Sequence, residues 1–95
     1  MGMKESYQEK MDAQLAEWQA KIDTLKAKAD KAEAKQKINY YEQIESLRTK
    51  QQKLQEKLDE LRNAGEGAWE EVKAGVESAW QDLKGAVEKA TEKFK

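Results

Sequence analysis

The chain has no cysteine, no histidine and no proline among its 95 residues. Without cysteine and histidine it cannot build a disulfide framework, a zinc site based on thiolates or imidazoles, or a catalytic site that depends on either group. Large apolar residues are scarce as well. Leu, Ile, Val and Phe together number 14, or about 15% of the chain, below the ~20% at which a globular fold becomes doubtful. The chain therefore depends on narrow apolar faces for whatever core it forms.

Charge of one sign is also lacking, because 18 basic residues nearly balance 19 acidic ones and leave a net charge of -1. This balance separates the chain from most disordered polyelectrolytes, whose net charge resists collapse. A nucleic-acid binder needs a strongly basic surface, so we expect no nucleic-acid partner. No stretch approaches the ~18 apolar residues that span a bilayer, and residues 1–10 lack the apolar core of a secretory signal, so we expect a cytoplasmic protein.

Helix formers dominate residues 5–62, which contain neither glycine nor proline. Ser6 and Glu9 match the capping box, in which a hydroxyl and a carboxylate satisfy two free amides at a helix start. We therefore predict a helix from about residue 6 to about residue 63. Apolar residues spaced alternately by four and three form a heptad seam along its first half. That seam consists of Met11, Leu15, Trp18, Ile22 and Leu25.

The middle of this predicted helix has little to bury. Residues 26–37 contain no large apolar side chain, and the seam resumes in a shifted register at Tyr40 and Ile44. Such a shift relaxes supercoiling locally or marks a bend. Because the segment offers no turn residue, we predict that the helix continues through it, with a bend near Ala32–Lys37 as the alternative.

Gly65–Gly67 is the first clear breaker, and Gly65 suits the left-handed position that often ends a helix. A second helix is predicted over about 68–94, where two eleven-residue units, Trp69–Ala79 and Trp80–Ala90, repeat one pattern. Eleven residues fill three helical turns, so the repeat keeps its apolar residues on one narrow face. This face holds Trp69, Val72, Val76, Trp80, Leu83, Val87 and Phe94.

These patterns predict an all-α fold in which the long helix and the shorter one form an antiparallel helical hairpin, a single unit over residues 1–95. Folding back at the glycines brings Phe94 near Gln36 and leaves the seam from Met11 to Leu25 without a partner in its own chain. Exposed apolar surface costs ~25 cal/mol per Å², so we expect a dimer or higher homo-oligomer joined through that seam. The alternative fold is a three-helix bundle with the bend near Ala32–Lys37.

The chain resembles a family of small bacterial coiled-coil proteins described as stress-response proteins after a cyanobacterial relative, with apolipoprotein-like eleven-residue repeats. The resemblance covers nearly the whole length. It rests on Leu15-x-x-Trp18 with Ile22 and Leu25, on the Lys/Ala run to Lys37, on Tyr40-Tyr41-Glu42-Gln43-Ile44, and above all on Trp69-x-x-Val72-Lys73-x-x-Val76-Glu77-x-Ala79-Trp80. It implies a soluble, cytoplasmic helical protein with no known chemistry, and it implies no site residues.

The sequence offers no candidate for catalysis, a cofactor, a metal or a small-molecule substrate. Adjacent carboxylates such as Glu70 and Glu71 point about 100° apart on a helix, and no phosphate-binding glycine loop is present. We therefore expect a non-enzymatic coiled-coil structural or protein-interaction module, and the resemblance implies a stress-related role for it. The alternative is reversible binding to a lipid or granule surface through the eleven-residue repeat, with weak contact because local charge is near zero.

Overall fold

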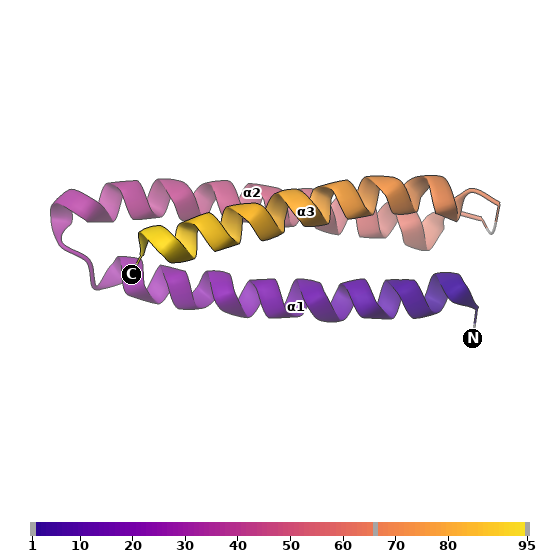
Figure 1. Ribbon diagram of the computed structural model, residues 1–95, viewed down its shortest axis with the longest axis horizontal. Helices are drawn as coiled ribbons and strands as arrows, with labels where there is room; N and C mark the ends of the chain where they lie inside the picture. The colour runs from indigo at the N-terminus through magenta and orange to yellow at the C-terminus, as the bar shows by residue number, and fades with distance from the viewer. Residues whose placement is uncertain (1, 66, 95) are drawn as a thin grey trace.

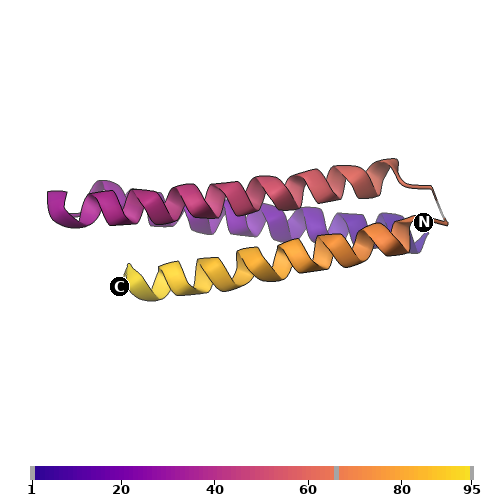
Figure 2. The ribbon, with the colours of Figure 1, turned by 90° about the horizontal axis from the view of Figure 1, so that it is seen from above.

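The computed structural model describes residues 2–65 and 67–94, and it confirms the all-α class. Three helices follow one another along the chain: α1 (Met3–Asp30), α2 (Ala34–Asn63) and α3 (Trp69–Lys93). They lie side by side in an elongated bundle of 51 × 18 × 18 Å (Figures 1 and 2). The chain runs along α1, back along α2 and forward again along α3, so α1 and α3 are parallel and both are antiparallel to α2.

The unbroken helix predicted over 6–63 is wrong, because the chain reverses between α1 and α2 at Lys31–Glu33. The amides of Lys31 and Ala32 donate to carbonyls three residues back, at 3.2 and 3.1 Å, which tightens the end of α1. Glu33 then adopts an extended conformation with φ -65° and ψ 152°. Every L-residue has access to this conformation, so the turn needs neither glycine nor proline.

Burial of the first seam explains why the chain turns there. Folding α1 back on α2 leaves Met11 4%, Leu15 8%, Ile22 0% and Leu25 3% exposed. Burial of such a side chain contributes about 1.5–3 kcal/mol, whereas each interrupted helical hydrogen bond costs a net 0.5–1.5 kcal/mol or so. The packing term is the larger one, and it overrides the good helix propensity of residues 26–37.

The helix ends differ from the predicted ones in detail. Helix α1 begins at Met3, so the capping box at Ser6 does not form, and the Ser6 amide instead donates to the Gly2 carbonyl at 3.2 Å. The chain does turn between α2 and α3 near the predicted Gly65–Gly67, although Glu66 lies outside the described residues. The expected left-handed Gly65 is wrong, because no glycine in the described part of the chain has a positive φ. Ala64 makes the corner instead, in an extended conformation with ψ 139°.

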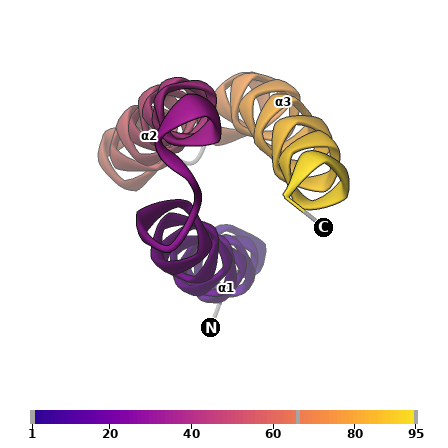
Figure 3. The same cartoon turned by 90° about the vertical axis from the view of Figure 1, so that its left-hand side faces the viewer.

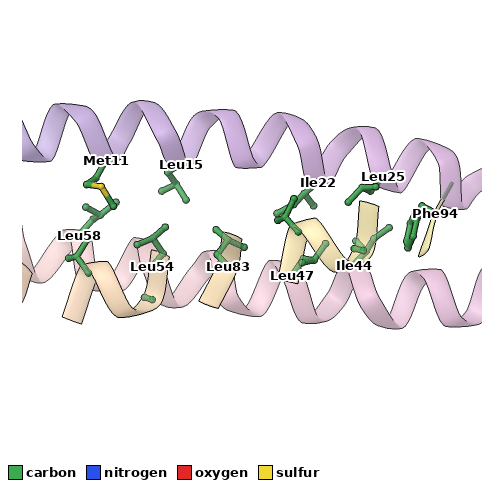
Figure 4. Packing of buried hydrophobic residues seen from close by; sticks show 14 of the residues in the cluster. Met11, Leu15, Ile22, Leu25, Ile44, Leu47, Leu54, Leu58, Leu83 and Phe94 are labelled. Carbon is green, nitrogen blue, oxygen red and sulfur yellow. The ribbon is translucent and has the colours of Figure 1, made fainter. Parts of the chain in front are cut away.

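A single apolar core runs the length of the bundle (Figure 4). Each helix contributes one stripe, and the stripes meet along the common axis. The buried residues are Met11, Leu15, Ile22, Leu25, Ala29, Ile44, Leu47, Leu54, Leu58, Leu61, Val76, Ala79, Leu83, Val87, Ala90 and Phe94. The antiparallel pairing of α2 and α3 brings Phe94 onto the ring of Tyr40, with 4.1 Å between centroids, about one helical turn from the predicted neighbour Gln36.

The α1–α3 seam as candidate functional site

The three helix pairs of the bundle are held together by different chemistry. Polar groups link α1 to α2 along its whole length. Arg62 Nη2 contacts both carboxylate oxygens of Asp12 at 3.1 and 3.0 Å, and Arg48 lies 3.5 Å from Asp23. The Tyr41 hydroxyl donates to the Asp30 carboxylate. Three carboxylates of α1 are therefore directed toward α2.

Small residues set the contact between α2 and α3. A Cβ atom added at Gly75 would lie 3.6 Å from Lys57 Cδ, an ordinary van der Waals contact. Ala79 shares a hollow with Lys50 and Lys53 of α2, so it too lies on the α2 side of α3. The distance between packed helices depends on side-chain size at the contact. The small edge of α3 therefore lets it approach α2 closely.

Aromatic rings fill the seam between α1 and α3. Tyr7 of α1 meets Trp69 of α3 with ring centroids 6.3 Å apart and planes tilted by 44°. Further along, Trp18 meets Trp80 at 6.4 Å with a tilt of 55°. These separations fall in the range favoured by aromatic pairs. The bulk of the rings keeps α1 and α3 further apart than the other two helix pairs (Figure 3).

Equal spacing puts the two ring pairs in register. Tyr7 and Trp18 are eleven residues apart on α1, and Trp69 and Trp80 are eleven apart on α3. Because α1 and α3 are parallel, one rise of about 16 Å along each helix leads from the first pair to the second. The eleven-residue spacing in α3 was predicted from the sequence, whereas the equal spacing in α1 was not. The matching interval between Tyr7 and Trp18 was the signal that pointed to this pairing.

Lysines lie over the rings of this seam. Lys21 Nζ is 4.7 Å from the Trp18 ring centroid, and Lys84 Nζ is 5.3 Å from that of Trp80. Lys73 Nζ is shared, at 5.0 Å from Tyr7 and 5.8 Å from Trp69. An exposed cation–π contact contributes about 0.5–1 kcal/mol. The seam is therefore apolar inside, with these lysines and the carboxylates of Glu77, Glu88 and Glu92 along its rim.

Polar ties across this seam are weak. Within residues 2–65 and 67–94, the hydrogen bond described between α1 and α3 runs from the Tyr7 hydroxyl to Glu77 Oε1, and it is long at 3.5 Å. The indole N–H groups of Trp18 and Trp80 are buried with no hydrogen-bond partner among the described residues. A buried donor without a partner costs about 1–3 kcal/mol. Each of these two groups therefore favours a state in which water reaches it.

Shifted pKa values in the described part of the chain follow from these contacts. Burial, together with the charge and hydrogen bond of Glu77, raises the pKa of Tyr7 to about 12. The hydrogen bond from Tyr41 lowers the pKa of Asp30, and the same bond raises the pKa of Tyr41. Both arrangements are hydroxyl-to-carboxylate bonds between helices, so they account for the shifts without a proton-transfer role.

Three of the surface hollows lie along the same seam, and another, of about 430 Å³, lies between α1 and α2. One of about 570 Å³ lies between Trp18 and Lys21 of α1 and Val87 and Thr91 of α3. A second, of about 300 Å³, adjoins it and shares Lys21 and Thr91. A third, of about 420 Å³, lies between the two ring pairs and is bordered by Tyr7 and Trp80. The α1–α3 seam is therefore the candidate binding site of the molecule.

The residues predicted to form an oligomer seam lie inside one chain. Met11, Leu15, Ile22 and Leu25 are buried in the bundle core, and Trp18 is half-buried against Trp80. The seven residues predicted for the hairpin or lipid face also turn inward. Val76, Leu83, Val87 and Phe94 are core residues, while Trp69, Val72 and Trp80 are half-buried against the core. The unpartnered seam that motivated an oligomer is thus covered by the chain itself.

Within the described residues, no group of three or more acidic side chains is placed to hold a metal ion. None of α1, α2 and α3, over the residues described, has a stretch long and apolar enough to cross a bilayer. Searches against protein-family models, curated proteins and solved structures found no match to this chain.

Proposed function

We propose that this chain is a non-enzymatic interaction module, a three-helix bundle that binds its partners by opening α1 away from α3. The observation that carries the proposal is the contrast between the seams. Helix α1 is tied to α2 by two arginine–carboxylate contacts and further hydrogen bonds, whereas its described polar tie to α3 is the long bond from Tyr7 to Glu77. The α1–α3 seam is therefore where the bundle separates at least cost.

The buried indole groups lower that cost further. Opening the seam exposes the N–H groups of Trp18 and Trp80 to water, which returns about 1–3 kcal/mol for each. Burial of the rings opposes this gain, so the closed bundle remains the ground state. The balance favours a seam that opens locally without unfolding the whole chain, as segments at the low-stability end of a protein do.

An amphipathic helix is the partner that the open seam fits best. Separation of α1 from α3 presents two apolar stripes, which include Ile22 and Leu83, to one incoming apolar face. A second copy of the chain, opened in the same way, carries such apolar faces on its own α1 and α3, so two open copies can pack against each other as a dimer. We therefore propose this dimer as the homo-oligomer that the sequence predicts. Cytoplasmic location and a stress-related role stay predictions.

Opening of the seam is tested by linking it. The chain has no cysteine, so Gln14→Cys with Gln81→Cys, which line one hollow across α1 and α3, can be joined by a bis-maleimide linker. The matched control joins α1 to α2 through Gln19→Cys and Gln51→Cys, whose native side chains are hydrogen-bonded. Hydrogen exchange of the tryptophan indole N–H groups is then measured by NMR in both linked chains.

We expect the α1–α3 link to slow exchange of the Trp18 and Trp80 indole N–H protons by about tenfold or more, because opening of the seam exposes them to water, and the α1–α2 link to change it much less. Equal slowing by both links would show that the bundle opens only by global unfolding, which contradicts the proposal. The same link should block mixed-dimer formation between labelled and unlabelled chains.

A lipid surface is the second candidate partner, and one observation favours it. Trp69 and Trp80 each have a lysine over the ring, Lys73 and Lys84, at the same position of the eleven-residue repeat. Tryptophan with flanking lysine is typical of helices that lie in the membrane interface. Opening would present this face to phospholipid.

Vesicles test this candidate. We expect vesicles of phosphatidylcholine with phosphatidylglycerol to shift the tryptophan emission of the free chain to the blue, more than pure phosphatidylcholine does. The chain linked across α1 and α3 should show no shift. Lipid binding through the seam would be excluded if neither vesicle type shifts the tryptophan emission of the free chain. It would also be excluded if the linked chain binds the vesicles as well as the free chain does.

A further inference from the structure

The series of aromatic pairs along the α1–α3 seam ends after the second pair. Eleven residues beyond Trp18 and Trp80 stand Ala29 and Thr91, which carry no ring. The two adjoining hollows of about 570 and 300 Å³ open on this part of the seam, and both are bordered by Lys21 and Thr91. We propose that this space, the third-step hollow, binds a small anionic amphiphile: a planar ring or short acyl chain that carries one acidic group.

The walls of the third-step hollow suit the apolar part of such a ligand. Trp18 closes one end, Leu25 lies on the α1 side and Val87 on the α3 side. The larger hollow, of about 570 Å³, is an open groove whose volume lies within the ~300–1,000 Å³ typical of small-molecule sites. A ring seated there would continue the series of aromatic contacts that the first two pairs begin.

The charge on the α1 side of the hollow favours an acidic head group. Lys21 and Lys28 border it from α1 and Lys89 from α3, against Glu88 and Glu92 of α3. The α1 side is purely basic because Asp23 and Asp30 of that helix contact Arg48 and Tyr41 of α2. A ligand with its acidic group toward α1 therefore meets Lys21 and Lys28, two turns apart on one helix face.

This inference goes beyond the proposed function, because the hollow exists only while α1 and α3 stay together. The two can be tested separately. The chain linked through Gln14→Cys and Gln81→Cys should lose binding that requires opening and keep binding in the third-step hollow. Loss of both, or retention of both, would refute one proposal without deciding the other.

The probe is 2-naphthalenesulfonate, titrated into the ¹⁵N-labelled full chain while the three tryptophan indole signals are followed by NMR. We expect a saturable shift of the Trp18 signal, a smaller one for Trp80 and none for Trp69. The uncharged 2-naphthalenemethanol should bind about tenfold more weakly, because it lacks the group that meets the lysines. Absence of a saturable Trp18 shift would overturn the proposal.

Two variants place the probe in the hollow. Thr91→Trp supplies the missing ring from the chain itself, so it should abolish binding and raise the midpoint of thermal unfolding. The matched control Thr49→Trp, at an exposed position of α2, should change neither. Lys28→Glu, also exposed, keeps the packing and should weaken binding about tenfold. Unchanged affinity in both Thr91→Trp and Lys28→Glu would contradict the assignment.

Discussion

Ile22 and Ile38 are the same amino acid in two opposite environments. Ile22 lies in the core with 0% of its surface exposed, whereas Ile38 is 67% exposed on α2. Nearby charges contribute much less. The Asp12–Arg62 pair is well formed, yet both side chains stay more than a third exposed, and such pairs are worth about 0–1 kcal/mol. The free energy of unfolding therefore depends mainly on the burial of apolar side chains, including those of α1.

Replacement of the two isoleucines tests that statement. Ile22→Ala should lower the free energy of unfolding by about 2–5 kcal/mol, because it removes buried methyl groups and leaves a cavity. Ile38→Ala should change it by less than about 0.5 kcal/mol. Urea titration followed by circular dichroism measures both. Similar small losses for the two variants would mean that the α1 stripe is not buried within the chain.

Tyr7 gives the seam a pH dependence. Burial and the neighbouring Glu77 raise its pKa in the folded chain to about 12, from 10.0 for an unperturbed tyrosine. A raised pKa means that folding favours the neutral phenol. Its contribution to stability is therefore complete below pH 10 and is lost as pH rises through about 12.

A comparison with Tyr7→Phe isolates this contribution, since lysines titrate in the same range in both chains. We expect the stability of the wild type to fall more steeply than that of Tyr7→Phe between pH 10 and pH 12. Tyrosinate absorbance should show one ionisation fewer near pH 12 in the variant. Parallel stability curves would show that Tyr7 is not held against Trp69 and Glu77.

At the scale of elements, the turn at Lys31–Glu33 decides the architecture. Glu33 has φ -65° and ψ 152°, the conformation that a residue before proline prefers. Ala34 is the first residue of α2, and its amide donates none of the hydrogen bonds described at this turn. Position 34 therefore meets both requirements for proline at a helix start.

Ala34→Pro should leave stability unchanged or raise it by about 0.4–1 kcal/mol, because proline restricts the unfolded chain. The control Ala27→Pro, at an exposed position inside α1, should cost about 3 kcal/mol or more. Thermal unfolding of both variants gives the comparison. In a continuous helix the two substitutions would be equally damaging, and that result would contradict the turn.

Much of each element could be read from the sequence. The apolar stripes and the eleven-residue repeat have a fixed period, so Val76, Leu83 and Val87 were placed on one face and are buried together. The break at Lys31–Glu33 could not be read in the same way. No residue there forbids a helix, and the turn forms because distant stripes gain from packing, which local propensity does not report.

At the scale of the whole molecule, the turn at Lys31–Glu33 decides which residues cover the apolar stripe of α1. A continuous first helix leaves Met11 to Leu25 in need of another chain, whereas the observed turn covers them with α2 and α3 of the same chain. The seam between α1 and α3 depends on the same turn, and the matching eleven-residue intervals were its one signal in the sequence. Tyr7 and Trp18 become partners of Trp69 and Trp80 only when α1 and α3 lie parallel.

One distance tests the bundle most directly. Glu9→Cys and Glu60→Cys place spin labels on exposed sites near the start of α1 and the end of α2, close to the contact between Asp12 and Arg62. The doubly labelled chain, diluted with unlabelled chain to suppress contacts between copies, is measured by pulsed electron paramagnetic resonance. Packed neighbouring helices predict a separation below about 30 Å. A separation near 75 Å, the length of about 51 helical residues, would contradict the three-helix bundle and every proposal built on its α1–α3 seam.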